Sequence, residues 1–142
     1  MGKHLVLRGK FPNYPPQTVR ILLIGDSTAR MVRSTFERVA QCPVDMIGTS
    51  CALNDVLFIK QMEALFASKQ FHYDCIFVQM GHHSIKNVRG KEYSEEDFNQ
   101  FRQDYIALLD YLRQFCDNLV LLTCFLNVSP LPKWAGSKMK SL

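Results

Sequence analysis

The chain has 142 residues, of which 47% are hydrophobic and 21% are charged, as in an ordinary soluble globular protein. This length predicts one domain with a sizeable core. The net charge of +4 comes from basic residues that are dispersed until the last ten positions, which favours a solvated face over a nucleic-acid-binding surface.

The remaining compositional signals concern the cellular setting. The apolar stretch within residues 1–8 is too short for a signal peptide, and no apolar run approaches the length that spans a membrane. The five cysteines are an odd number without a C-x-x-C pair, so we predict neither a metal site nor a disulfide framework. We therefore expect a cytoplasmic protein with no membrane or nucleic-acid partner.

The first half of the chain predicts a lead-in followed by a strand, a helix and a strand. Residues 1–18 contain three prolines and predict an extended N-terminal lead-in, after which the domain spans 19–128. An apolar run predicts a buried strand over 19–24, and apolar residues at helical spacing predict a helix over 29–41. A short strand is expected over 44–47.

The second half continues the alternation. We predict a helix over 54–66, a strand over 75–80, a long helix that Ser94 caps, and another buried strand over 119–124. The long helix carries an apolar stripe that should face the core. Its members are Phe98, Phe101, Tyr105, Leu108, Leu112 and Phe115.

The order β-α-β-α-β-α-β with continuous apolar strands predicts an α/β fold. Such strands form a parallel sheet covered by helices on both faces, which gives a three-layer α/β/α, flavodoxin-like architecture. The tail, 129–142, contains Pro130, Pro132 and Gly136 and is expected to be irregular. A complete fold would hold a further helix and strand there, so we expect the domain to be truncated at its C-terminus.

Three polar turns follow the first three strands of this predicted sheet: Gly25-Asp26-Ser27, Gly48-Thr49-Ser50 and Gly81-His82-His83. Because the carboxyl ends of parallel strands share one edge, these turns should lie together where α/β sheets bind ligands. Ser27 would sit at the start of a helix, whose amides favour an anion, including an oxyanion. Alternatively, Asp26 and Ser27 form only a helix-capping turn.

These turns resemble the sequence blocks of the SGNH (GDSL) hydrolase superfamily over residues 19–125. Ile24-Gly25-Asp26-Ser27 matches the first block, Gly48 the second, and the turn at Gly81 the third. The polysaccharide O-acetyltransferase and PC-esterase branch is the most similar. Its members often carry an arginine three residues after the nucleophile, matched by Arg30, and a Gly-His pair in the third block, matched by Gly81-His82.

The resemblance implies a serine esterase or acetyltransferase that needs no cofactor and no metal. Ser27 would be the nucleophile that attacks a small acyl ester, such as an O-acetyl ester of a carbohydrate. The amides of Ser27 and Gly48 would hold the oxyanion, assisted by Arg30 or a third-block side chain. Asp26, Gly81 and His82 would complete the oxyanion and substrate-binding set.

Two departures from the family concern the general base. The third block has His83 where the family usually has asparagine, and the family's last block, Asp-x-x-His, occurs nowhere in the chain. Either the chain is a fragment whose base lay downstream, or His82 or His83 acts as a local base, with His83 our candidate catalytic residue. In a third interpretation both histidines shape the loop or bind substrate.

Two functions of other classes stay open. Without the Asp-x-x-His block, the chain could be a catalytically incomplete SGNH-like fold that binds a ligand or partner. A nucleotide- or phosphate-binding module would use the turn at Gly25 and the helix start that follows it. We rank the nucleotide function last, because the sequence contains neither Gly-x-Gly-x-x-Gly nor the P-loop pattern.

Overall fold

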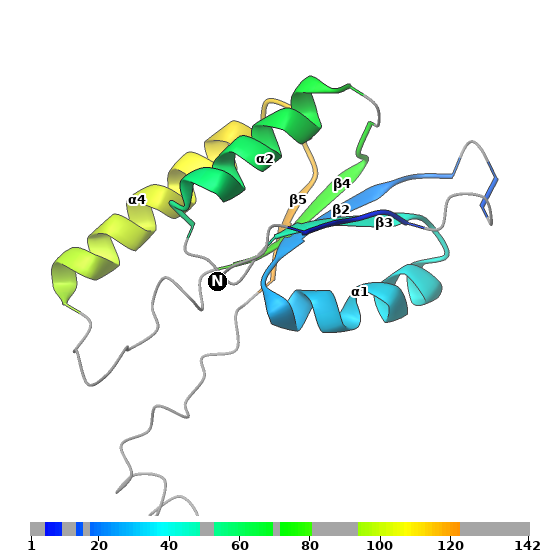
Figure 1. Cartoon of the computed structure of the whole chain (residues 1–142), viewed down its shortest axis with the longest axis horizontal. Helices are drawn as coiled ribbons and strands as arrows, with labels where there is room; N and C mark the ends of the chain where they lie inside the picture. The colour runs from blue at the N-terminus through cyan, green and yellow to red at the C-terminus, as the bar shows by residue number, and fades with distance from the viewer. Residues whose placement is uncertain are drawn as a thin grey trace, which may run out of the picture.

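The structure is a computed structural model that describes residues 5–9, 14–15, 18–48, 53–69, 72–80 and 94–122 (Figure 1). Its strands are β1 (Leu5–Leu7), β2 (Ile21–Gly25), β3 (Val44–Gly48), β4 (Cys75–Gln79) and β5 (Leu119–Leu121). Its helices are α1 (Ser27–Ala40), α2 (Val56–Ala67) and α4 (Glu95–Leu112).

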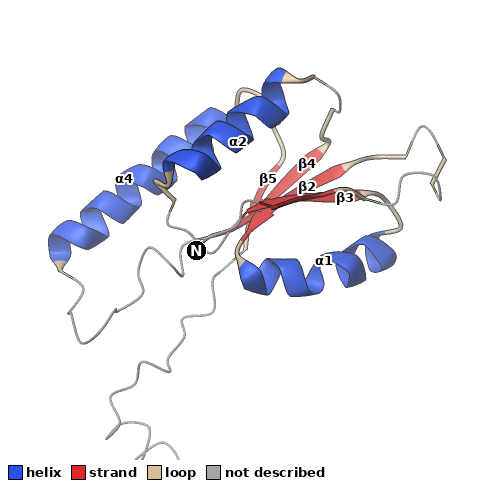
Figure 2. Ribbon diagram, viewed as in Figure 1, coloured by secondary structure: helices blue, strands red, loops and turns tan. Residues whose placement is uncertain are grey.

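The strands form one sheet in the order β1-β3-β2-β4-β5 (Figure 2). The neighbours among β3, β2, β4 and β5 are all parallel, whereas β1 runs antiparallel to β3. The parallel α/β sheet that the sequence predicts is therefore confirmed, with the flavodoxin-like strand order. Strand β1 was not predicted, because it lies in the stretch that we expected to be only an extended lead-in.

Helices cover the two faces of the sheet unequally. Helix α1 packs on one face, while α2 and α4 lie together on the other (Figure 1). On the α2–α4 side, Leu22, Ile24, Ile76 and Val78 contribute side chains that are fully buried against the two helices. The alternate residues of β2 and β3 face α1 instead, as the two-residue period of a strand requires.

The helix starts follow from local capping. Ser94 accepts a hydrogen bond from the Asp97 amide at 3.2 Å, and the Ser94 amide donates to Asp97 Oδ2 at 3.0 Å. This reciprocal pair is a capping box, which satisfies amides that the first turn leaves unpaired. The N-cap role predicted for Ser94 is confirmed.

Two details of the predicted packing are wrong. Strand β5 is not buried, since Val120 and Leu121 are 37% and 50% exposed beside no further described strand. Phe98 is 53% exposed, because the first turn of α4 extends past the sheet (Figure 1). On α1, Val32 is half-exposed and Val39 is 78% exposed, so the apolar positions that predicted this helix do not all face the sheet.

A buried carboxylate joins the segments around the amino-terminal ends of the parallel strands. Asp45, in β3, has no exposed surface and accepts hydrogen bonds from Arg20 Nε at 2.7 Å and Arg20 Nη2 at 2.6 Å. The Tyr73 hydroxyl donates to it at 2.7 Å and the Gly9 amide at 2.8 Å. Three other segments of the chain are thereby fixed to β3 through one side chain.

Candidate functional site

The turn after β2 reverses the chain within one residue. Gly25 ends the strand, Asp26 is the N-cap, and Ser27 is the first residue of α1. Asp26 is buried, and its Oδ1 accepts hydrogen bonds from the amides of Thr28 at 2.9 Å and Ala29 at 3.4 Å. The capping interaction is therefore present, and it holds the start of α1 at the carboxyl end of β2.

Ser27 occupies the place in the fold that the sequence predicts. Its side chain is exposed, at the amino end of α1 and the carboxyl edge of the sheet. Within the described residues its hydroxyl makes no hydrogen bond, and Asp26 Oδ1 takes the next two amides rather than the amide of Ser27. The hydroxyl is thus accessible to a molecule approaching this edge.

Two glycines bring the first and second turns into contact. Gly25 and Gly48 are register partners in the parallel pair of β2 and β3. A Cβ on Gly48 would lie 1.7 Å from the Gly25 carbonyl oxygen, and one on Gly25 would lie 2.2 Å from the Ala29 Cβ. Glycine is required at both positions because the strand ends and the start of α1 approach so closely.

Replacing Gly48 by alanine is expected to destabilise the fold by about 3 kcal/mol, the upper range for overpacking. The added methyl group would meet backbone atoms of Gly25, which cannot move without breaking the strand pairing. Urea unfolding monitored by circular dichroism measures this loss. Gly25→Ala serves as the comparison, because its clash is with a side chain and Ala29→Gly should relieve part of it.

Of the third predicted turn, the structure describes only the strand that leads into it. Strand β4 lies on the other side of β2, with Gln79 the register partner of Gly25, and Met80 after it is buried. The strand that leads to the third turn is therefore adjacent to the strand that leads to Ser27. Gly81, His82 and His83 themselves lie outside the described residues, so their predicted roles stay predictions.

Two arginines on α1, Arg30 and Arg33, differ in the hydrogen bonds and ion pairs that they form. Arg33 Nη1 donates to the Val44 carbonyl at 2.8 Å and lies 3.6 Å from Glu37 Oε1, so its charge is used within the fold. Arg30 is exposed and makes no hydrogen bond or ion pair with described residues. Of the two, Arg30 is the guanidinium available near the start of α1.

The described ranges also contain other side chains that can bind metals or react as nucleophiles. No group of three or more His, Cys, Asp or Glu side chains there could hold a metal ion. Cys42, Cys75 and Cys116 are free thiols. His72 is at the opposite edge of the sheet, exposed, with Nε2 at 3.9 Å from Asp74 Oδ1.

No protein-family model and no curated protein matches this chain. The fold is shared by many unrelated activities, so function has to be argued from the turn at Ser27. Across the described residues, no helix has both the length and the apolar character needed to cross a membrane. Sequence reasoning missed two features, the buried cluster around Asp45 and a cavity between α2 and α4, because neither has a local motif.

Proposed function

We propose that this chain is a serine ester hydrolase of the SGNH type, or an acetyltransferase of the same chemistry, acting on an O-acylated carbohydrate or another small ester. The observation that carries the proposal is the exposed Ser27 hydroxyl at the first position of α1, on the edge where parallel sheets bind ligands. The close approach of Gly25 and Gly48 supports it, since the end of β3 is brought against the residue two positions before Ser27.

The proposed reaction proceeds through an acyl-enzyme. Ser27 Oγ attacks the ester carbonyl carbon, its proton passes to a base, and the carbonyl oxygen becomes an oxyanion. The amides of Ser27 and Gly48 donate to that oxyanion, with Arg30 adding positive charge. Collapse expels the alcohol, which takes the proton, and attack by water or an acceptor alcohol then releases the acyl group.

The base in this proposal is His83, with His82 holding the substrate or the oxyanion. A histidine titrates near neutrality and can accept the serine proton at physiological pH. Support comes from topology, because β4 pairs with β2 and delivers the chain to the same edge. A base located on a further segment of the protein is the alternative.

Labelling with a fluorophosphonate probe tests the nucleophile directly, because the reagent modifies only activated hydroxyl groups. We expect a single adduct, which peptide mass spectrometry locates on Ser27. The helix provides a matched residue, Ser34, which is also exposed on α1 but lies seven residues, about two helical turns, beyond Ser27. Labelling of Ser34 at the same rate, or of neither residue, would contradict the proposal.

The histidine assignment has its own expected outcome. His83→Ala should abolish labelling of Ser27, whereas His82→Ala should leave it largely intact, because only the base activates the hydroxyl. Labelling rates of the two variants and the parent chain at neutral pH measure the difference. Equal effects of the two substitutions, or none, would remove His83 from the mechanism.

One observation favours a second function, a binding module without catalysis. The Asp26 carboxylate already satisfies the amides of Thr28 and Ala29, as a purely structural cap would. In that case an O-acylated carbohydrate would bind without turnover and without probe labelling. The same carboxylate places negative charge at the helix start, which disfavours the phosphate-binding alternative.

The cellular setting belongs to the proposal as well. We propose a cytoplasmic protein that handles a small-molecule or carbohydrate ester and uses no cofactor. Support for this is compositional, from the cysteine pattern and the dispersed positive charge.

A further inference from the structure

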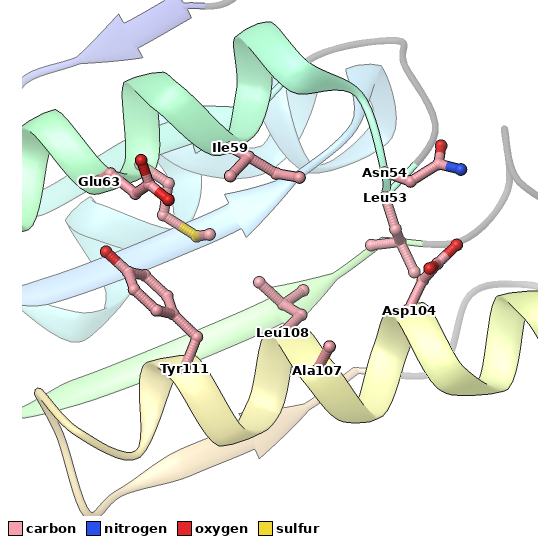
Figure 3. Close-up of a pocket in the computed structure, with 9 residues that line it drawn as sticks. Leu53, Asn54, Ile59, Glu63, Asp104, Ala107, Leu108 and Tyr111 are labelled. Carbon is pink, nitrogen blue, oxygen red and sulfur yellow. The ribbon is translucent and has the colours of Figure 1, made fainter.

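Helices α2 and α4 border a half-open cavity of about 210 Å³ that the proposed ester chemistry does not use (Figure 3). Both helices cover the same face of the sheet (Figure 1). Residues from both helices line the cavity. Its apolar wall continues the core, since Leu53, Met62 and Leu108 are 4%, 3% and 6% exposed. Ile59 and Ala107 complete that wall nearer the surface.

Two acidic side chains lie beside this apolar wall, one from each helix. Glu63 comes from α2 and Asp104 from α4, and both line the cavity (Figure 3). Glu63 is exposed and Asp104 is half-buried, where it accepts a hydrogen bond from Gln100 Nε2 at 2.9 Å. No described lysine or arginine forms an ion pair with either carboxylate.

Tyr111 adds a polar group beside Glu63. In Figure 3 its ring borders the cavity and its hydroxyl points toward the α2 side, where Glu63 lies. Burial, together with the nearby Glu63 carboxylate, raises the pKa of Tyr111, so this hydroxyl stays protonated at neutral pH. The lining thus combines an apolar wall with two carboxylates, a neutral phenol and the side-chain amide of Asn54, and the described lining contains no cationic side chain.

We propose that this cavity binds a small amine whose apolar body lies against Met62 and Leu108 and whose ammonium group faces Glu63 or Asp104. Charge complementarity selects the class, since two carboxylates without a described cation repel acids and attract protonated amines. Size limits it further. An apolar cavity of about 150 Å³ accommodates a benzene ring, so this one leaves room for a ring with a short chain.

Titration of the full chain with 2-phenylethylamine, followed by NMR of the backbone amides, tests the proposal. The amine should shift resonances of α2 and α4 in a saturable manner, whereas 3-phenylpropionate, of similar shape but opposite charge, should not. 2-Phenylethanol should bind about three- to fivefold more weakly than the amine, the effect of one partly exposed ion pair. Equal binding of amine and acid, or no saturable shift with the amine, would overturn the proposal.

Variants separate charge from shape. Glu63→Gln and Asp104→Asn, combined in one variant, should weaken amine binding by about three- to fivefold, while Asp110→Asn, a charge change at an exposed site on α4, should not. Ala107→Leu should block the cavity and abolish binding, since leucine keeps the helix propensity of this exposed position. Unaltered binding in Ala107→Leu would place the amine elsewhere. Ser27→Ala should bind normally, which makes this test independent of the esterase proposal.

Discussion

Replacing Ser27 by alanine is expected to reduce hydrolysis of p-nitrophenyl acetate to the uncatalysed background. A nucleophile acts as a unit with its base and oxyanion donors, so its removal costs on the order of 10⁴-fold or more in turnover. Because the side chain is exposed and makes no hydrogen bond with described residues, stability should change by no more than about 0.5 kcal/mol. Initial rates at equal concentrations of folded protein give the comparison.

The control for this experiment lies on the same helix. Ser34→Ala removes another exposed hydroxyl from α1 and should retain the parent rate. A rate for Ser27→Ala equal to that of the parent chain would show that this hydroxyl is not the nucleophile. The binding-module function would then be the better explanation of the turn.

Replacing Asp45 by alanine should destabilise the fold by about 3–5 kcal/mol, as expected when one partner of a buried ion pair is removed. Arg20 is only 5% exposed and would keep its charge next to an apolar core without its carboxylate partner. The Tyr73 hydroxyl and the Gly9 amide would lose their acceptor at the same time. Urea unfolding followed by circular dichroism measures the loss.

An exposed ion pair supplies the matched control. Asp110 and Arg113 lie 3.1 Å apart with side chains 63% and 66% exposed, so Asp110→Ala should cost less than about 0.5 kcal/mol. If Asp45→Ala and Asp110→Ala had similar effects, the buried cluster would not be a main source of stability.

Asp45 also predicts how stability depends on pH. Burial alone would raise its pKa, but hydrogen bonds from Arg20, the Gly9 amide and Tyr73 outweigh it and leave the pKa below the ordinary value. A carboxyl with a lowered pKa in the folded state stabilises fully above its unfolded pKa, about 3.9, and less as pH falls below that value. Asp45→Asn should therefore show a shallower loss of stability than the parent as the pH falls below about 4. An unchanged acid profile would contradict this assignment.

Periodicity and local turn chemistry were sufficient to predict most of the fold. Continuous apolar runs identified the strands β2, β3 and β4, and their alternation with helices predicted the parallel sheet that the structure has. Ser94 was recognisable as an N-cap because capping depends on neighbours three residues away. Such features are encoded within one short window of sequence.

Features that depend on distant partners were not predictable in this way. Leu5–Leu7 becomes a strand only because β3 offers it an edge, and nothing within the lead-in indicates that partner. Asp45 stands in an otherwise apolar strand, where its partners lie 25 to 37 residues away in the chain. The same holds for the cavity, whose carboxylates come from two helices separated by β4.

In the candidate site, too, the features set by neighbouring residues were predictable and those set by distant residues were not. The Ser27 turn follows from a strand, a capping aspartate and a glycine within four positions, so its location was predictable. The need for glycine at position 48 follows from the distance to the Gly25 backbone, which only the paired strands reveal. His83 stays a prediction, since it lies outside the described residues.

The cluster around Asp45 has a consequence for how the protein opens. An edge strand of three residues would ordinarily fray on its own, because few contacts hold it. Here Gly9, the second residue after β1, donates its amide to a fully buried charge. If β1 detaches, the Asp45 carboxylate loses the hydrogen bond from the Gly9 amide. The opening of this edge strand is therefore energetically coupled to the opening of β3, which carries Asp45. Amide hydrogen exchange at Gly9 should accordingly be as slow as in β2, a sign of cooperative rather than gradual unfolding.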